Sequence, residues 1–283
     1  MQIEVIIEKK SHKLDAEEGK TILETLQEHG IHVLTAPCGG RGRCGKCTVE
    51  VEHMGEVLAC MTKVTDGMRI TIPKVQLRAQ KSKIAENGTV THYPADDGEG
   101  LDAACDIGTT TVVCHLIDGK TGEKLATVSE PSAQRSFGAD VLSRIQAAEA
   151  GKLEILKEQI IFQIAQMLRT LQKKTGRGEQ IQRLAVVGNT VMCHLFAGIS
   201  PVSIGVTPFM PQEFFGKEYT GEQLGLTDCR SVYIAPAVAG FVGGDITSDL
   251  LAVMQKKPKD KVLLLDIGTN GEMAVGNEDQ IYC

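Results

Sequence analysis

Four cysteines in the N-terminal part of the chain have a spacing that suits metal ligation. Cys38, Cys44 and Cys47 follow the pattern C-x5-C-x2-C, and Cys60 comes after twelve further residues. Four thiolates of this kind can hold a single zinc ion or an iron–sulfur cluster. Structural zinc usually uses two C-x2-C pairs, whereas this stretch has one, and glycines fill its long first gap. Because glycine lets backbone amides approach the sulfurs, the spacing favours a 2Fe–2S cluster over zinc.

The segments around these cysteines indicate a β-grasp outline. Apolar and polar residues alternate, as in half-buried strands, at 3–7, 48–51 and 69–72. Thr21 and Glu24 can form a capping box for a helix that ends at Gly30. Residues 1–80 therefore resemble a plant-type ferredoxin domain, whose cysteines follow C-x4-C-x2-C with a distant fourth. The alternative, a small ubiquitin-like interaction module, leaves four thiols unexplained.

Two polar features bear on how such a domain would be used. Arg41, Arg43 and Lys46 lie inside the cysteine loop, where they could meet an acidic redox partner or simply be solvated. Residues 81–101 lose all apolar periodicity and end in an acidic, glycine-containing stretch. We expect this segment to be a linker that lets the first domain move between an electron donor and an acceptor.

A turn motif occurs twice in the rest of the chain. Residues 105–118 and 263–276 both carry Asp-Ile-Gly-Thr, at Asp106 and Asp266, between β-rich segments. One such turn is common in ordinary hairpins, but two in the same setting favour a phosphate site, in which glycine admits backbone amides and Thr hydroxyls donate. Each Asp could hold a hydrated magnesium ion or orient a water, so we expect both to be catalytic. The expected nucleotide contacts from these turns are Gly108, Thr109, Thr110, Gly268, Thr269 and Asn270.

Between the two turns the chain alternates helices and strands. Helical periodicity starts at 137–145 and continues at 153–176, and buried-type strands are expected at 183–187 and 231–235. The first strand leads into Gly188, Asn189 and Thr190, which could form a ligand edge or only a helix cap and turn. After the second strand, Gly243 and Gly244 could admit a ligand or let two backbones pack closely. We count all five as candidate cofactor contacts.

The composition limits the classes of protein. The chain has 283 residues, which is enough for two or three domains, and its net charge of −6 gives no support to nucleic-acid binding. No signal peptide or membrane-spanning run is evident, so we expect a cytoplasmic protein without a membrane partner. Nine cysteines then argue for metal or redox chemistry in a reducing compartment. The five outside the cluster motif are expected to be small buried hydrophobes, at positions 105, 114, 193, 229 and 283.

The duplicated turns resemble the phosphate hairpins of the actin, sugar kinase and acetate kinase (ASKHA) superfamily, in which two related subdomains close on ATP. This resemblance implies an α+β and α/β multidomain chain: a β-grasp 2Fe–2S ferredoxin followed by ASKHA-like α/β domains. The expected divisions are 1–80 for the ferredoxin, 81–101 for the linker, 102–180 for a middle domain and 181–283 for the start of a C-terminal domain. The last domain would be incomplete, because the chain stops within its first strands.

The order of motifs resembles one family in particular, the RACE family of reductive activators of corrinoid enzymes. The shared features are the ferredoxin cysteines, Phe-Gly-Ala-Asp-Val-Leu-Ser-Arg-Ile from residue 137, Gly-Asn-Thr, Gly-Gly-Asp and both Asp-Ile-Gly-Thr turns. The resemblance implies a cluster on Cys38, Cys44, Cys47 and Cys60, and ATP with Mg²⁺ at the turns. It also implies ATP-dependent reduction of cob(II)alamin to cob(I)alamin on the corrinoid protein of a methyltransferase system. An upstream low-potential electron donor is required, and a homodimer is conceivable. The alternative is a simple 2Fe–2S electron-transfer protein with a non-catalytic α/β interaction domain.

Overall fold

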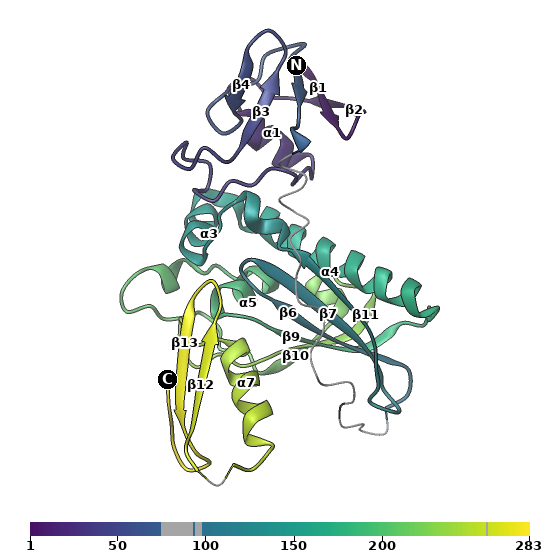
Figure 1. Cartoon of the computed structure of the whole chain (residues 1–283), viewed down its shortest axis with the longest axis vertical. Coiled ribbons are helices and arrows are strands. Elements are labelled where there is room, and N and C mark those ends of the chain that lie inside the picture. Colours follow the sequence, from purple (N-terminus) through teal and green to yellow (C-terminus); the bar gives the residue numbers. More distant parts are fainter. Residues whose placement is uncertain (75–92, 94–97, 259) are drawn as a thin grey trace. The chain divides into compact units, whose positions relative to one another are not determined.

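The computed structural model describes residues 1–74, 93, 98–258 and 260–283 (Figure 1). The chain divides into two compact units. The first contains residues 1–83 and 133–150, and the second contains 84–132 and 151–283. Most of the expected linker, at 81–92 and 94–97, lies outside the described residues.

The first unit is built on a five-stranded sheet in the order β2-β1-β5-β3-β4. Strands β1 and β5 are parallel, and the other neighbours are antiparallel. A capping box of Thr21 and Glu24 starts α1, as expected, and the apolar side of this helix joins the core. The β-grasp prediction is confirmed. The elements are β1 (Gln2–Ile7), β2 (Lys10–Asp15), α1 (Ile22–Glu28), β3 (Thr48–Val51), β4 (Gly55–Leu58) and β5 (Arg69–Thr71).

The same unit contains a short helical segment from the middle of the chain. It comprises a 3-10 helix, η1 (Ala133–Ser136), and α3 (Val141–Ala147), followed by a π-helical turn, η2 (Ala148–Lys152). The helix begins later than the 137–145 periodicity suggests. The reason is Asp140, whose carboxylate accepts a hydrogen bond from the Ser143 amide at 2.7 Å and caps the helix there.

The second unit contains a six-stranded sheet in the order β10-β11-β9-β6-β7-β8. Strands β6 to β8 form an antiparallel meander, β9 runs parallel to β6, and β11 runs parallel to β9. The sheet therefore continues across residue 180, and the boundary expected there falls inside it because β6 and β9 are hydrogen-bonded. The strands are β6 (Leu101–Ile107), β7 (Thr111–Asp118), β8 (Lys124–Pro131), β9 (Ile181–Val187), β10 (Lys217–Thr220) and β11 (Cys229–Ile234).

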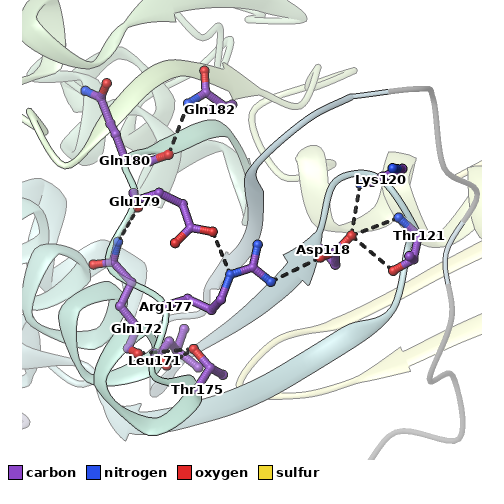
Figure 2. Close-up of polar contacts among 10 residues, drawn as sticks. All are labelled: Asp118, Lys120, Thr121, Leu171, Gln172, Thr175, Arg177, Glu179, Gln180 and Gln182. Carbon is purple, nitrogen blue, oxygen red and sulfur yellow. Dashed lines mark hydrogen bonds and ion pairs between the residues drawn. The ribbon is translucent and has the colours of Figure 1, made fainter.

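The long helix α4 (Leu153–Thr175) packs on β7 and β8 and buries the expected apolar stripe. It ends at Gly176, whose φ of 68° is left-handed. Figure 2 shows how the chain then turns into β9: the Arg177 guanidinium donates to Asp118 at 3.1 Å and to Glu179 at 2.6 Å. The remaining helices are α5 (Thr190–Ala197), η3 (Val202–Gly205), α6 (Gly221–Leu224) and α7 (Gly244–Met254). None of the helices in the described ranges combines the length and apolar character that crossing a bilayer requires.

A second meander follows α7, in the order β12-β13-β14. Its strands are β12 (Val262–Ile267), β13 (Gly271–Gly276) and β14 (Ile281–Tyr282), and all neighbours are antiparallel. This meander repeats the arrangement of β6, β7 and β8, and each Asp-Ile-Gly-Thr turn joins the first two strands of its meander (Figure 1). The duplication expected from the two turns is confirmed at the level of the fold.

Candidate functional site

The four ferredoxin cysteines lie together as two pairs. The Cys44 and Cys38 sulfurs are 3.4 Å apart, and the Cys47 thiol interacts with that of Cys60. Cys47 and Cys60 are buried, whereas Cys38 and Cys44 are partly exposed. A 2Fe–2S cluster takes four cysteine ligands, two for each iron, so two adjacent pairs match its donor set.

Backbone amides of the loop point at these sulfurs. Burial alone would raise the pKa of Cys38, but the amides of Cys44, Arg43 and Arg41, with the Cys44 thiol, outweigh it and lower the pKa to about 6. Burial and the neighbouring Cys47 thiol raise the pKa of Cys60 to about 12, although the Gly42 amide opposes this. Amides directed at sulfur stabilise thiolate ligands and tune a cluster.

The arrangement also bears on the zinc alternative. In the described part of the chain, no group of three or more His, Cys, Asp or Glu side chains surrounds a single metal position. Two separate thiol pairs suit a binuclear cluster better than one tetrahedral ion. Of the other five cysteines, the four at 105, 114, 193 and 229 are buried as expected, but Cys283 is exposed.

The two Asp-Ile-Gly-Thr turns meet in the second unit. The Thr110 and Thr269 hydroxyl oxygens are 2.6 Å apart, although 159 residues separate them. Beside them the Asn189 side-chain amide donates to the Thr109 hydroxyl at 2.9 Å, and the Asn189 oxygen caps α5 by accepting from the Met192 amide. Three of the predicted contact segments therefore come together through side chains.

The glycines of these turns let backbones approach closely. A Cβ on Gly243 would lie 2.5 Å from Asn189 Cα and 2.6 Å from the Thr190 nitrogen, and one on Gly108 would lie 2.6 Å from the Thr111 carbonyl oxygen. Gly188 is equally tight, against Ile107 at 2.7 Å. These glycines bring the ends of β6 and β9 close to the start of α7.

Some predicted contacts are used within the protein instead. The Thr190 side chain is fully buried and donates to the Ala239 carbonyl at 2.7 Å. Gly244 packs against Ala235, where a Cβ would be 3.0 Å from the Ala235 carbonyl oxygen. In the second turn, the Gly268 amide donates to the Asn270 carbonyl oxygen at 3.0 Å and closes the hairpin.

Several carboxylates gather at the same turns. Surrounding protein desolvates the Asp106 carboxylate and raises its pKa to about 7, with further contributions from Asp245, Asp249 and Asp266, while the residue as a whole is exposed at the surface. Burial also raises the pKa of Asp245, Asp249 and Glu272, and in each case the Asp266 charge adds to the effect. Neighbouring like charges are typical of a site that binds a cation, but no three of these carboxylates, all of them in the described part of the chain, are placed to hold one ion together.

Sequence reasoning proposed Asp106 and Asp266 but missed three members of this acidic group. Asp245 follows the Gly243-Gly244 pair directly, so the Gly-Gly-Asp motif was an available signal. Asp249 lies one helical turn later on α7, and i to i+4 spacing places it on the same face. Glu272 is opposite Asp266 across the β12–β13 hairpin. We call these five carboxylates the acidic group: Asp106, Asp245, Asp249, Asp266 and Glu272.

The close approach at Gly243 gives a first testable prediction. Gly243→Ala should lower the free energy of unfolding by about 1–3 kcal/mol, because its methyl group would overlap backbone atoms that cannot rotate away. Gly178→Ala is the matched control, since a Cβ there has no atom within 4 Å. Urea unfolding of both variants measures the difference, and equal midpoints for the two would show that the packing at Gly243 is looser than described.

Comparison with known proteins gives two matches to family models. A model described as "RACo middle region" matches residues 101–257, and one described as "2Fe-2S iron-sulfur cluster binding domain" matches residues 4–74. Among solved structures, one titled "Reductive activator for corrinoid,iron-sulfur protein" is similar, with a TM-score of 0.62 and 26% identity over 99% of this chain and 62% of that one.

Two curated proteins are also similar. "Corrinoid activation enzyme RamQ" of Eubacterium limosum is 29% identical over 88% of this chain and 55% of its own length. "[Co(II) methylated amine-specific corrinoid protein] reductase" of Methanosarcina barkeri is 28% identical over 63% of this chain and 34% of its own length. The chain thus spans about half the length of the first of these relatives and less of the second. Because the middle-region model covers more than half of its 283 residues, the chain belongs to the RACo middle region family and carries a 2Fe–2S cluster binding domain before that region.

Proposed function

We propose that this chain serves in the ATP-dependent reductive activation of a corrinoid protein, in which cob(II)alamin accepts one electron and becomes cob(I)alamin. The printed names of the two curated relatives, a corrinoid activation enzyme and a corrinoid protein reductase, support this reaction. A corrinoid protein of a methyltransferase system is the proposed partner, and a low-potential protein is the proposed electron donor. A cytoplasmic location and a homodimer are further proposals.

One observation carries the proposal. The duplicated turns meet through Thr110 and Thr269 next to the acidic group, in a chain whose other unit pairs four thiols. A plain electron carrier has no need for five solvent-accessible carboxylates gathered at two glycine turns. Burial first, and then the neighbouring carboxylates, raise the pKa values of Asp106, Asp245, Asp249 and Glu272, so their ionised forms cost stability that a bound cation would offset.

The residues divide into two sets of roles. Cys38, Cys44, Cys47 and Cys60 would hold the cluster, which supplies one-electron reduction when bound. Asp106 and Asp266 would hold magnesium through their carboxylates, with Asp245 beside them. The proposed phosphate contacts are Gly108, Thr109, Thr110, Gly188, Asn189, Gly243, Gly268, Thr269 and Asn270. Of the predicted set, Thr190 and Gly244 serve to position these segments.

The binding of Mg-ATP and the binding of the partner protein must affect each other through thermodynamic linkage. Mg-ATP can favour a state that docks the corrinoid protein only by binding that state more tightly. Thr110 and Thr269 lie on different meanders, so bridging phosphates would stabilise one relation between the two hairpins. The partner must then raise the affinity for ATP by the same factor by which ATP raises the affinity for the partner.

The decisive experiment is anaerobic reduction of a cob(II)alamin-loaded corrinoid protein, followed by its visible spectrum with and without Mg-ATP. We expect cob(I)alamin to form only when Mg-ATP is present. A non-hydrolysable ATP analogue separates binding from hydrolysis and serves as the control. Equal reduction without nucleotide would support the plain electron-transfer alternative, and no reduction in either condition would contradict the proposal for this chain.

A further inference from the structure

The cysteine loop carries an excess of positive charge. Residues 29–49 contain Arg41, Arg43 and Lys46 but no Asp or Glu, although acidic and basic side chains are nearly balanced over residues 1–74. All three cationic residues are exposed. The loop is therefore a locally positive surface on a ferredoxin fold whose charge is otherwise balanced, and we call these three residues the basic rim.

The backbone of the loop places this charge next to the proposed cluster ligands. The main-chain amides of Arg41 and Arg43 point at the Cys38 sulfur, and the Arg41 guanidinium donates through Nε to the Cys38 carbonyl oxygen at 2.8 Å. Gly40 and Gly42 have φ values of +81° and +69°, which let the chain turn its amides inwards at this point. The same residues thus present amides to a sulfur and exposed positive charge to solvent.

The arginine charges of the basic rim are not neutralised by carboxylates. Elsewhere in the ferredoxin fold, Lys20 forms ion pairs with two glutamates, and Arg69 pairs with Glu4 at 3.0 Å. Within the described ranges, neither Arg41 nor Arg43 forms an ion pair. Exposed charges without a counter-charge act on an approaching molecule over roughly 10 Å at moderate ionic strength. These two are therefore available to a partner.

The basic rim also coincides with the more accessible pair of thiols. Cys38 and Cys44 are partly exposed, whereas Cys47 and Cys60 are buried. Because electron transfer between proteins slows steeply with distance, a donor gains most by approaching the partly exposed pair. A protein that approaches there meets the basic rim, so its own surface must be acidic for the encounter to be favourable.

We propose that the basic rim is the docking surface for an electron-donor protein that carries carboxylates around its own flavin or iron–sulfur centre. The reduced centre of the donor loses one electron and the oxidised cluster of this chain gains it, with no bond made or broken. A small charged patch suits a brief encounter, in which charge mainly raises the association rate. The corrinoid protein fits less well, because its docking is proposed to depend on Mg-ATP, whereas the basic rim is present without nucleotide.

This inference rests on the proposed function, which requires a donor, but its test needs neither ATP nor a corrinoid protein. Failure of this test and failure of corrinoid activation are therefore distinguishable.

The test is anaerobic stopped-flow reduction of the full chain, carrying its cluster, by the hydroquinone of flavodoxin, an acidic flavoprotein. We expect the second-order rate constant to fall by about tenfold or more as salt rises from about 20 to about 300 mM. The double variant Arg41→Glu/Arg43→Glu should be reduced about tenfold or more slowly at low salt and should lose the salt dependence. The methyl viologen radical, a small cation, should instead reduce this variant faster than the wild type.

Lys10→Glu/Lys13→Glu is the matched control, with the same change of net charge at exposed residues of β2, which is three strands away from β3 in the sheet. It should keep at least about half of the wild-type rate constant. Arg41→Lys/Arg43→Lys keeps the charge and should react like the wild type. Binding is read independently from the chemical shifts of ¹⁵N-labelled oxidised flavodoxin, which has no electron to give, and the glutamate variant should bind it several-fold more weakly.

Three outcomes would overturn the proposal. A wild-type rate constant that does not depend on salt, or equal slowing in the β2 control, would show that the basic rim does not guide the donor. Slower reduction of the glutamate variant by both reductants would assign the arginines to holding the cluster. Unchanged kinetics with flavodoxin but slower cob(II)alamin reduction would assign the surface to the corrinoid protein instead.

Discussion

Cys60→Ser should reduce the iron content of the purified chain by at least about tenfold and remove the visible absorption of the cluster. Cys60 is the proposed fourth ligand, and it is buried next to Cys47. A serine hydroxyl is a harder and far less acidic ligand than a thiol, so it would leave one iron with a single thiolate from its pair. Because the cluster is the group proposed to carry the electron, its loss should also stop the corrinoid reduction that we propose.

Cys283→Ser is the matched control, because Cys283 is exposed and belongs to the other unit. It should keep full iron content and an unchanged visible spectrum. Iron and acid-labile sulfide analysis after anaerobic reconstitution measures both variants. Retention of a normal cluster in Cys60→Ser would mean that another group provides the fourth ligand.

The ferredoxin part of the fold could be predicted from the sequence because its determinants are local. The capping box of Thr21 and Glu24 lies within one helical turn, and the strand alternation is visible over five or six residues. The cysteine spacing constrains the loop directly. The duplicated Asp-Ile-Gly-Thr turn could likewise be recognised in the sequence, because each copy lies between two adjacent strands of one hairpin.

Contacts between residues that are far apart in the sequence could not be predicted in the same way. The pairing of β9 with β6 places residues on both sides of the expected boundary at 180 in one sheet, and no local pattern reports strand order. Asp249 was missed because a single carboxylate on a helix normally faces water. It becomes part of the acidic group only because α7 starts beside Gly188, whose carbonyl accepts from the Asp245 amide at 3.2 Å.

The hydrogen bond from the Gln27 side chain to the Ser136 carbonyl oxygen illustrates the same limit. Gln27 reads as a polar position at the end of an amphipathic helix, and nothing in its neighbours indicates a partner more than a hundred residues away. Only the fold shows that its amide is buried.

Asp106→Asn should have opposite effects on function and on stability. It should lower the Mg-ATP-stimulated rate of corrinoid reduction by about two orders of magnitude, because an amide replaces a carboxylate proposed to hold magnesium. It should also make the chain more resistant to urea at pH 8 without nucleotide. Surrounding protein and three neighbouring carboxylates raise the pKa of Asp106 to about 7. The ionised form of this side chain therefore destabilises the folded chain.

The sign of the pH dependence follows from this raised pKa. Between the usual value of 3.8 and about 7, the folded chain keeps a proton on Asp106 that the unfolded chain has lost. The free energy of unfolding therefore falls as pH rises through this window, and the destabilisation is complete above it. Asp106→Asn removes the effect, so its advantage over wild type should be greatest at pH 8 and vanish near pH 4.

Urea unfolding at a series of pH values measures this difference, with the exposed Asp279→Asn as the matched control. Saturating magnesium should reverse the order at pH 8, since a cation that binds the folded chain stabilises it and the Asn variant binds it less well. A variant that loses the nucleotide response without gaining stability would place Asp106 outside the acidic group. Combined loss of function and gain of stability would mean that the chain keeps these carboxylates together for their ligand, at the expense of its own fold.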